Sequence, residues 1–113
     1  MNSKFQTRFP ELTNDKLKME CLCLCAFSEQ SVSIGKLYLT DRRIVFYRFR
    51  DASKQSILWE DIQDVIDSWG VHLSMRDSKT CRIYTLKHYS TFKEITKVKN
   101  ELKESSWWRF LPI

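Results

Sequence analysis

The chain has 113 residues, of which 42% are hydrophobic and 13% aromatic, and it carries a formal net charge of +5 with only two Gly and two Pro. This length and composition suit a single domain over residues 1–113 and exclude a largely disordered chain or a loop-dominated scaffold. No apolar run approaches the roughly 18 to 20 residues that a membrane-spanning helix needs. Charges stand where a secretory signal would have its apolar core, so we expect a cytoplasmic location.

Residues 1–16 form an expected leader segment that contains Pro10 and several polar residues. We expect it to lie on the fold with at most a turn or two of helix. Its candidate apolar anchors are Phe5, Phe9 and Leu12.

The first expected strand spans residues 17–27, where apolar residues occupy both parities except at two charged positions. This pattern is typical of a strand that is covered on both sides or that bends around a core. Cys21, Cys23 and Cys25 alternate along it and therefore point to one side. The spacing suits neither a disulfide within the strand nor a metal site. We predict that the cysteines pack as small hydrophobic residues, and we predict no metal and no cofactor.

Residues 35–47, GKLYLTDRRIVFY, predict a β-hairpin that supplies the second and third strands. Apolar residues that suit a half-buried pleated surface flank a turn of Thr40, Asp41 and Arg42. The apolar positions are Leu37, Leu39, Ile44, Val45, Phe46 and Tyr47.

Short strands continue the pattern beyond the hairpin. We expect strands at residues 55–59, 63–68, 71–75 and 80–87, with a tight turn at Glu60-Asp61 and another at residues 77–79. With the first strand and the two strands of the hairpin, about seven strands are expected. Their short turns favour an antiparallel sandwich or barrel within residues 17–88.

The periodicity changes to that of a helix at residues 90–104. Thr91 followed three residues later by Glu94 is a capping-box pattern, which predicts the start of the helix. Apolar residues behind it recur at helical spacing, at Phe92, Ile95, Val98 and Leu102. We expect this amphipathic helix to cap the open end of the bent sheet.

Charge is unevenly distributed along the chain. Residues 42–54 contain five basic residues, whereas residues 60–67 contain four acidic residues and no basic one. Arg48 and Arg50 share strand parity, so we expect both guanidinium groups on one side, where they can bind phosphate oxygens. With Lys54 and Lys36 they are the candidate anion site; the alternative is an ordinary solvated strand end.

Two further segments are candidate partner surfaces. The acidic run offers Glu60, Asp61 and Asp64, and the tail at residues 105–113 offers Trp107, Trp108 and Phe110. The tail either packs on the sheet, sits at a membrane interface or docks on another domain or protein. Because this cluster stands at the end of the sequence, we expect the chain to be a segment of a longer protein.

The hairpin and its flanking strands resemble the GRAM family, whose fold is similar to the pleckstrin-homology (PH) fold. The resemblance lies in a first strand ending in Cys-Ala, a G-x-L-Y-L-T hairpin running into Phe-Tyr, a W-E-D-I segment and a helix that begins with Phe. It is carried over residues 9–102 by Cys25, Ala26, Gly35, Leu37, Tyr38, Leu39, Thr40, Phe46, Tyr47, Ile57, Trp59, Glu60, Asp61, Ile62, Ile66, Tyr84 and Phe92.

The resemblance implies a mainly β fold, a PH-like sandwich or barrel of about seven antiparallel strands in two opposed sheets, capped by one C-terminal amphipathic helix. It also implies a non-catalytic module that attaches a host protein to membranes through phosphoinositide or phosphatidylserine headgroups. The first loop, SEQSVSI, has no basic residue, so the expected anion contacts move to Arg48, Arg50 and Lys54.

A protein-interaction scaffold is the alternative to lipid binding. Nucleic acid ranks third: the run RRIVFYRFR interleaves aromatic residues with arginines, but the signature of an RNA-recognition domain is absent. The sequence contains no motif for nucleotide binding, metal-dependent hydrolysis or a nucleophilic serine, so we do not expect an enzyme.

Overall fold

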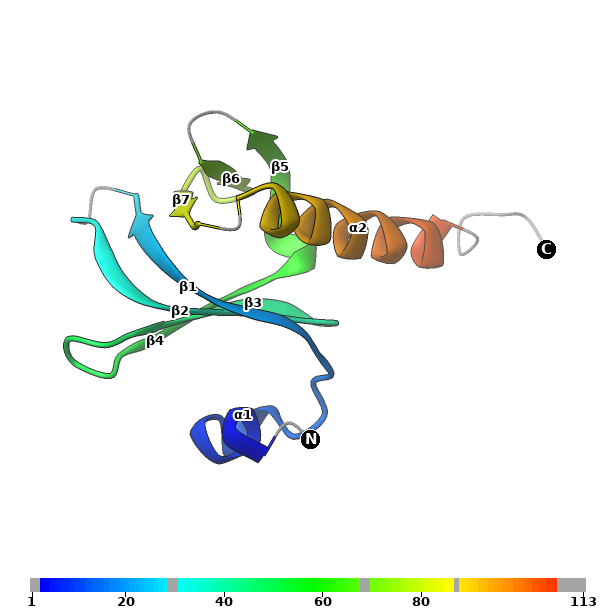
Figure 1. Cartoon of the computed structure of the whole chain (residues 1–113). Coiled ribbons are helices and arrows are strands. Elements are labelled where there is room, and N and C mark those ends of the chain that lie inside the picture. Colours follow the sequence, from blue (N-terminus) through cyan, green and yellow to red (C-terminus); the bar gives the residue numbers. More distant parts are fainter. Residues whose placement is uncertain (1–2, 29–30, 68–69, 87, 108–113) are drawn as a thin grey trace.

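The computed structural model describes residues 3–28, 31–67, 70–86 and 88–107 (Figure 1). Two short helical segments precede seven strands, and one long helix follows them. The elements are α1 (Ser3–Arg8), η1 (Pro10–Leu12), β1 (Leu17–Phe27), β2 (Ser33–Thr40), β3 (Arg43–Arg48), β4 (Lys54–Leu58), η2 (Trp59–Asp61), β5 (Ile62–Asp67), β6 (Val71–Met75), β7 (Thr80–Tyr84) and α2 (His88–Trp107).

The seven strands form one antiparallel sheet in the order β4-β3-β2-β1-β7-β6-β5. The long strand β1 joins its two halves, because it pairs with β2 over residues 17–25 and with β7 over residues 24–27. The halves are therefore continuous in hydrogen bonding and are not two separate sheets. The predicted class of seven antiparallel strands and one C-terminal helix is confirmed.

Most predicted boundaries hold, but the start of the helix does not. The helix α2 begins at His88, so Thr91 lies inside its first turn and does not cap it. Thr91 is fully buried, and its Oγ1 lies 3.2 Å from Oγ1 of Thr85 in the connection from β7. The predicted capping box is therefore wrong, because the hydroxyl contacts Thr85 and, at 3.9 Å, the sulfur of Cys21 on β1. Strand β7 also ends at Tyr84, earlier than expected.

The main core lies between the inner faces of the bent sheet and α2. Ile95 and Val98 of α2 are buried there together with Cys23, Cys25 and Cys81, and Cys21 is partly buried against this cluster, so the predicted packing of the cysteine ladder is confirmed. None of the four cysteines forms a disulfide. Burial raises the pKa of the Cys23 thiol, and a 3.5 Å contact with the sulfur of Cys81, followed by burial, raises the pKa of the Cys25 thiol.

Gly35 lets the second and third strands pack closely. It pairs with Arg48, and a Cβ at this position would overlap the carbonyl oxygen of Tyr47 and lie 2.8 Å from the Phe46 ring. Any side chain would therefore displace an aromatic ring that is 3% exposed in the core.

The leader packs on the outer face of the sheet. Figure 1 shows α1 on one side of the β1–β4 layer and α2 on the other. Phe5, Phe9 and Leu12 are buried against Tyr38 and Val45, so the three predicted anchors are confirmed. Phe9 meets the Tyr38 ring edge-on with the ring centroids 5.1 Å apart.

The leader covers only part of this outer face. Leu22 and Leu24 of β1 project from it and are 63% and 43% exposed. Of the two alternatives for β1, a strand covered on both sides is therefore excluded, and a strand that bends around the core is confirmed, since β1 pairs with both β2 and β7.

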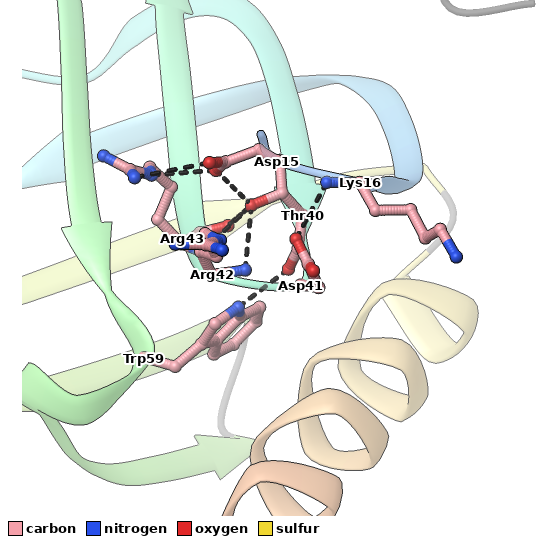
Figure 2. A network of polar contacts seen from close by, with 7 residues as sticks. All are labelled: Asp15, Lys16, Thr40, Asp41, Arg42, Arg43 and Trp59. Atoms are coloured by element: carbon pink, nitrogen blue, oxygen red, sulfur yellow. Dashed lines mark hydrogen bonds and ion pairs between the residues drawn. The ribbon is translucent and has the colours of Figure 1, made fainter. Parts of the chain in front are cut away.

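A buried carboxylate ties the leader to the hairpin turn (Figure 2). The side chain of Asp15 is 2% exposed and accepts hydrogen bonds from Arg43 Nε and from Thr40 Oγ1, both at 2.8 Å. Arg43 thus forms a buried ion pair with Asp15. Such a pair holds because each buried polar atom has a partner.

Thr40 is the centre of this network. Its Oγ1 accepts hydrogen bonds from the backbone N–H groups of Arg42 and Arg43 at 3.1 and 3.0 Å. Its carbonyl oxygen accepts a hydrogen bond from Trp59 Nε1 at 2.8 Å, as Figure 2 shows. One residue therefore holds the leader, the hairpin turn and η2 together.

Replacing Thr40 by Val should lower the free energy of unfolding by about 1–3 kcal/mol, because buried donors and a carboxylate oxygen lose a partner. Thr40→Ser keeps the hydroxyl and should lose clearly less stability. Urea denaturation of the two variants measures the difference. Equal stability of the Val and Ser variants would contradict the role of the hydroxyl.

Candidate functional site

The predicted anion site lies where β3 runs into the turn before β4. Arg48, the last residue of β3, donates from Nε to Asp51 Oδ1 and to Ser53 Oγ, both at 3.0 Å. Its Nη2 donates to Asp51 Oδ2 at 3.1 Å. The guanidinium group of Arg48 therefore closes the turn onto itself.

Arg50 lies in the turn itself, because β3 ends at Arg48. The prediction that the two arginines share strand parity is therefore wrong. Arg50 is exposed and forms no ion pair with any residue that the structure describes. Ala52 adopts a left-handed φ of 58°, a conformation in which Ala is uncommon, so the contacts of Arg48 hold the turn in shape.

Lys36 and Lys54 lie on the outer face, on either side of Tyr47, since both pair with it across the sheet. Lys36 Nζ lies 3.3 Å from Glu20 Oε1. Lys54 Nζ donates to the carbonyl oxygen of Arg8 at 2.7 Å and lies 5.0 Å from the centroid of the Phe9 ring. The two lysines therefore lie in one row on the outer face, whereas Arg48, the residue after Tyr47, points to the opposite face of the pleated sheet.

The acidic candidates surround the start of β5. Glu60 and Asp61 belong to η2 and Asp64 to β5, and all three are exposed. The carbonyl oxygen of Glu60 accepts a hydrogen bond from Arg76 Nε at 2.7 Å. Of the tail candidates, Trp107 is the last residue of the α2 backbone, whereas Trp108 and Phe110 lie outside the described residues.

A cavity of about 580 Å³ opens between β4 and the turn that joins β6 to β7. Its apolar lining comes from Phe27, Ile57 and Met75, and charged side chains on its rim come from Asp61, Arg76, Asp77 and Lys79. Sequence reasoning missed it, because its residues come from four segments that only the sheet topology brings together.

Asp51 is the carboxylate with a strong shift at this end of the sheet. Hydrogen bonds from Ser53, and next from Arg48, lower the pKa of Asp51 to about 2. The turn therefore keeps a negative charge beside Arg48 at any pH above this value.

Neither a group of metal ligands nor a membrane-spanning helix occurs among the residues that the structure describes. No three His, Cys, Asp or Glu side chains there are grouped so that they could hold a metal ion. None of the helices there is both long and apolar enough to cross a bilayer.

No protein-family model and no curated protein matches this sequence. Solved structures do match its fold. The C-terminal domain of an unknown protein from Leishmania infantum aligns with a TM-score of 0.78 at 18% identity, over 87% of this chain and 96% of that domain.

Two solved structures that contain PH domains also match. The Vps36 N-terminal PH domain aligns with a TM-score of 0.68 at 13% identity, over 80% of this chain and 83% of the other. The linker-DH/PH domains of p115-RhoGEF align with a TM-score of 0.64 at 10% identity, over 84% of this chain and 32% of the other. The fold is therefore PH-like, as the resemblance implied.

Removing the hydroxyl of Ser53 should raise the pKa of Asp51 from about 2 toward its ordinary value. Because the pKa is lowered in the folded protein, this carboxylate stabilises the fold above its unfolded pKa, and the stabilisation disappears as the pH falls through about 2. A carboxyl ¹³C NMR titration of the wild type and Ser53→Ala measures both values. An Asp51 that titrates at its ordinary pKa in the wild type would contradict the turn geometry.

Proposed function

We propose that the chain is a non-catalytic recognition module of the GRAM type, which attaches the protein that carries it to the cytoplasmic face of membranes. It does so peripherally, by binding the anionic headgroups of phosphoinositides or phosphatidylserine. The observation that carries the proposal is Arg50, an exposed guanidinium group at the tip of a turn whose shape is held by Arg48. The PH-like fold and the order of the GRAM-like motifs support it.

The four basic residues have different roles in this proposal. Arg50 contacts the phosphate directly, and Arg48 positions the turn. Lys36 and Lys54 add positive charge when they leave their partners within the protein and bind phosphates instead. This exchange costs little free energy, because surface ion pairs such as Lys36–Glu20 contribute only about 0–1 kcal/mol. An anionic surface with many phosphates therefore competes well for these lysines.

The alternative is a protein-interaction scaffold that uses the acidic segment or the aromatic tail. The cavity beside Asp61 favours it, because apolar lining with charges of both signs on the rim suits a peptide side chain. Glu60, the neighbour of Asp61 in η2, and Asp64 on β5 are also exposed and would add contacts to a basic partner.

Arg50→Glu should weaken binding to liposomes that contain phosphatidylserine or phosphoinositide by roughly tenfold or more, because one attraction is lost and one repulsion is gained. Flotation at low and high salt measures it, and salt should weaken wild-type binding. Arg42→Glu is the matched control, since Arg42 is exposed at the opposite end of the hairpin.

Two outcomes would contradict the lipid proposal. The first is no flotation on any acidic liposome, and the second is an equal loss with Arg42→Glu, which would indicate a charge effect without a site. Retention of one protein partner in high salt, abolished by Asp61→Lys or by Trp107→Ala with Trp108→Ala, would favour the scaffold instead.

A further inference from the structure

An apolar row crosses the part of the outer face that the leader leaves open. Leu24 pairs with Ile34 across β1 and β2, and with Tyr84 across β1 and β7. The backbone N–H of Phe49 donates to the carbonyl oxygen of Ile34 at 3.2 Å, which continues the row beyond β3. Residues that are paired in this way project from the same face of a sheet. The row therefore reads Tyr84, Leu24, Ile34 and Phe49.

The members of this row are unusually exposed for large apolar side chains. Leu24, Ile34 and Phe49 are 43%, 57% and 45% exposed, and Leu22 in the adjacent row is 63% exposed. Single exposed apolar residues are ordinary, but a contiguous set on one face marks an interaction surface. Phe49 also contacts Tyr47 with the ring centroids 6.1 Å apart, so the row continues into the cluster beneath the leader.

Arginines stand at both ends of the row. Arg82 precedes Tyr84 by two positions on β7 and points to the same side, and Arg50 follows Phe49 in the turn. Both are exposed, and neither forms an ion pair with a carboxylate that the structure describes. The acidic residue of β1, Glu20, precedes Leu24 by four positions and therefore lies two rows away from the apolar row. The surface is thus apolar in the middle and cationic at its ends.

We propose that this surface, formed by Leu22, Leu24, Ile34 and Phe49, is seated on an anionic phospholipid bilayer. The apolar side chains enter the boundary between headgroups and acyl chains, while Arg50 and Arg82 bind phosphates. Charge complementarity selects this occupant over a protein partner, since the arginines at both ends are free to meet a uniformly anionic plane. The inference rests on the proposed function and adds to it an orientation and a hydrophobic contribution.

The position of the leader sets the tilt of the docked domain. The leader covers the rows near Tyr38 and Val45, whereas the open row lies toward the turn between β3 and β4. The sheet is therefore inclined, with that turn nearest to the bilayer. The helix α2 packs on the opposite side of the β1–β4 layer and faces away from the lipid (Figure 1).

Methyl NMR with a paramagnetic lipid tests this orientation. The whole chain, with ¹³C-labelled Leu and Ile methyl groups, is added to phosphatidylcholine–phosphatidylserine bicelles that carry doxyl-labelled lipid. The methyl signals of Leu22, Leu24 and Ile34 should broaden strongly. The signal of Ile66 on β5, which is 50% exposed, should broaden little.

A double variant measures the hydrophobic contribution. Leu24→Thr with Ile34→Thr should weaken partitioning into phosphatidylserine vesicles by roughly tenfold, because two aliphatic side chains no longer enter the membrane. Thr suits an exposed strand position, so the fold is retained, which circular dichroism checks. Ile66→Thr is the matched control and should leave partitioning unchanged.

The outcomes separate the two proposals. Vesicle binding without broadening at Ile34, or binding unaffected by the double variant, overturns the orientation and leaves headgroup binding in place. No binding to any anionic vesicle overturns both. Chemical-shift changes along the row that depend on protein concentration in the absence of lipid would assign the surface to a second copy of the chain and overturn the bilayer.

Discussion

The buried carboxylate of Asp15 is the group on which the arrangement of this domain depends. An ionised carboxylate with 2% exposure would be costly without partners, and Arg43 and Thr40 supply them. Each partner comes from a different part of the hairpin, so the charge is satisfied only when the leader, the strands and the turn are all in place. This polar network acts together with the aromatic packing of Phe5 and Phe9, and it fixes where the leader stops covering the sheet.

The edge of the leader divides the outer face of the sheet into a covered part and an exposed part. Several basic residues that stand out in the sequence have internal partners: Arg43 with Asp15, Arg48 with Asp51, Lys36 with Glu20. The positive charge that faces outward is therefore smaller than the composition suggests and is placed differently. It comes from residues such as Arg50 and Arg82, which stand beside exposed apolar side chains.

The strands were predictable wherever apolar and polar residues alternate or where a charged turn interrupts them. The bounds of β1 and β6 follow directly from these patterns, and so does the buried stripe of Ile95 and Val98 on α2. The start of α2 was not predictable, because the hydroxyl of Thr91 meets Thr85 and the sulfur of Cys21 on β1, and not a free amide at the helix end. A local pattern does not reveal a tertiary partner of this kind.

The site was less predictable than the fold, for the same reason. Both parities of β1 are apolar. Cys23 and Cys25 are buried in the core with α2, whereas Leu22 and Leu24 stay exposed because the leader does not cover them. The prediction that Arg50 points to the same side as Arg48 was also wrong, because β3 ends two residues before Arg50. The exposed apolar row and the cavity beside Asp61 each combine residues from distant segments, so neither has a signature in the linear sequence.

The cysteine ladder has a consequence for the chemical durability of the core. Thiolates, not thiols, react with oxidants and alkylating agents, and the raised pKa values of Cys23 and Cys25 keep both sulfur atoms protonated. The two thiols therefore react with such agents only after the sheet opens. The rate at which these two thiols become modified therefore reports the rate at which the domain unfolds, independent of binding at its surface.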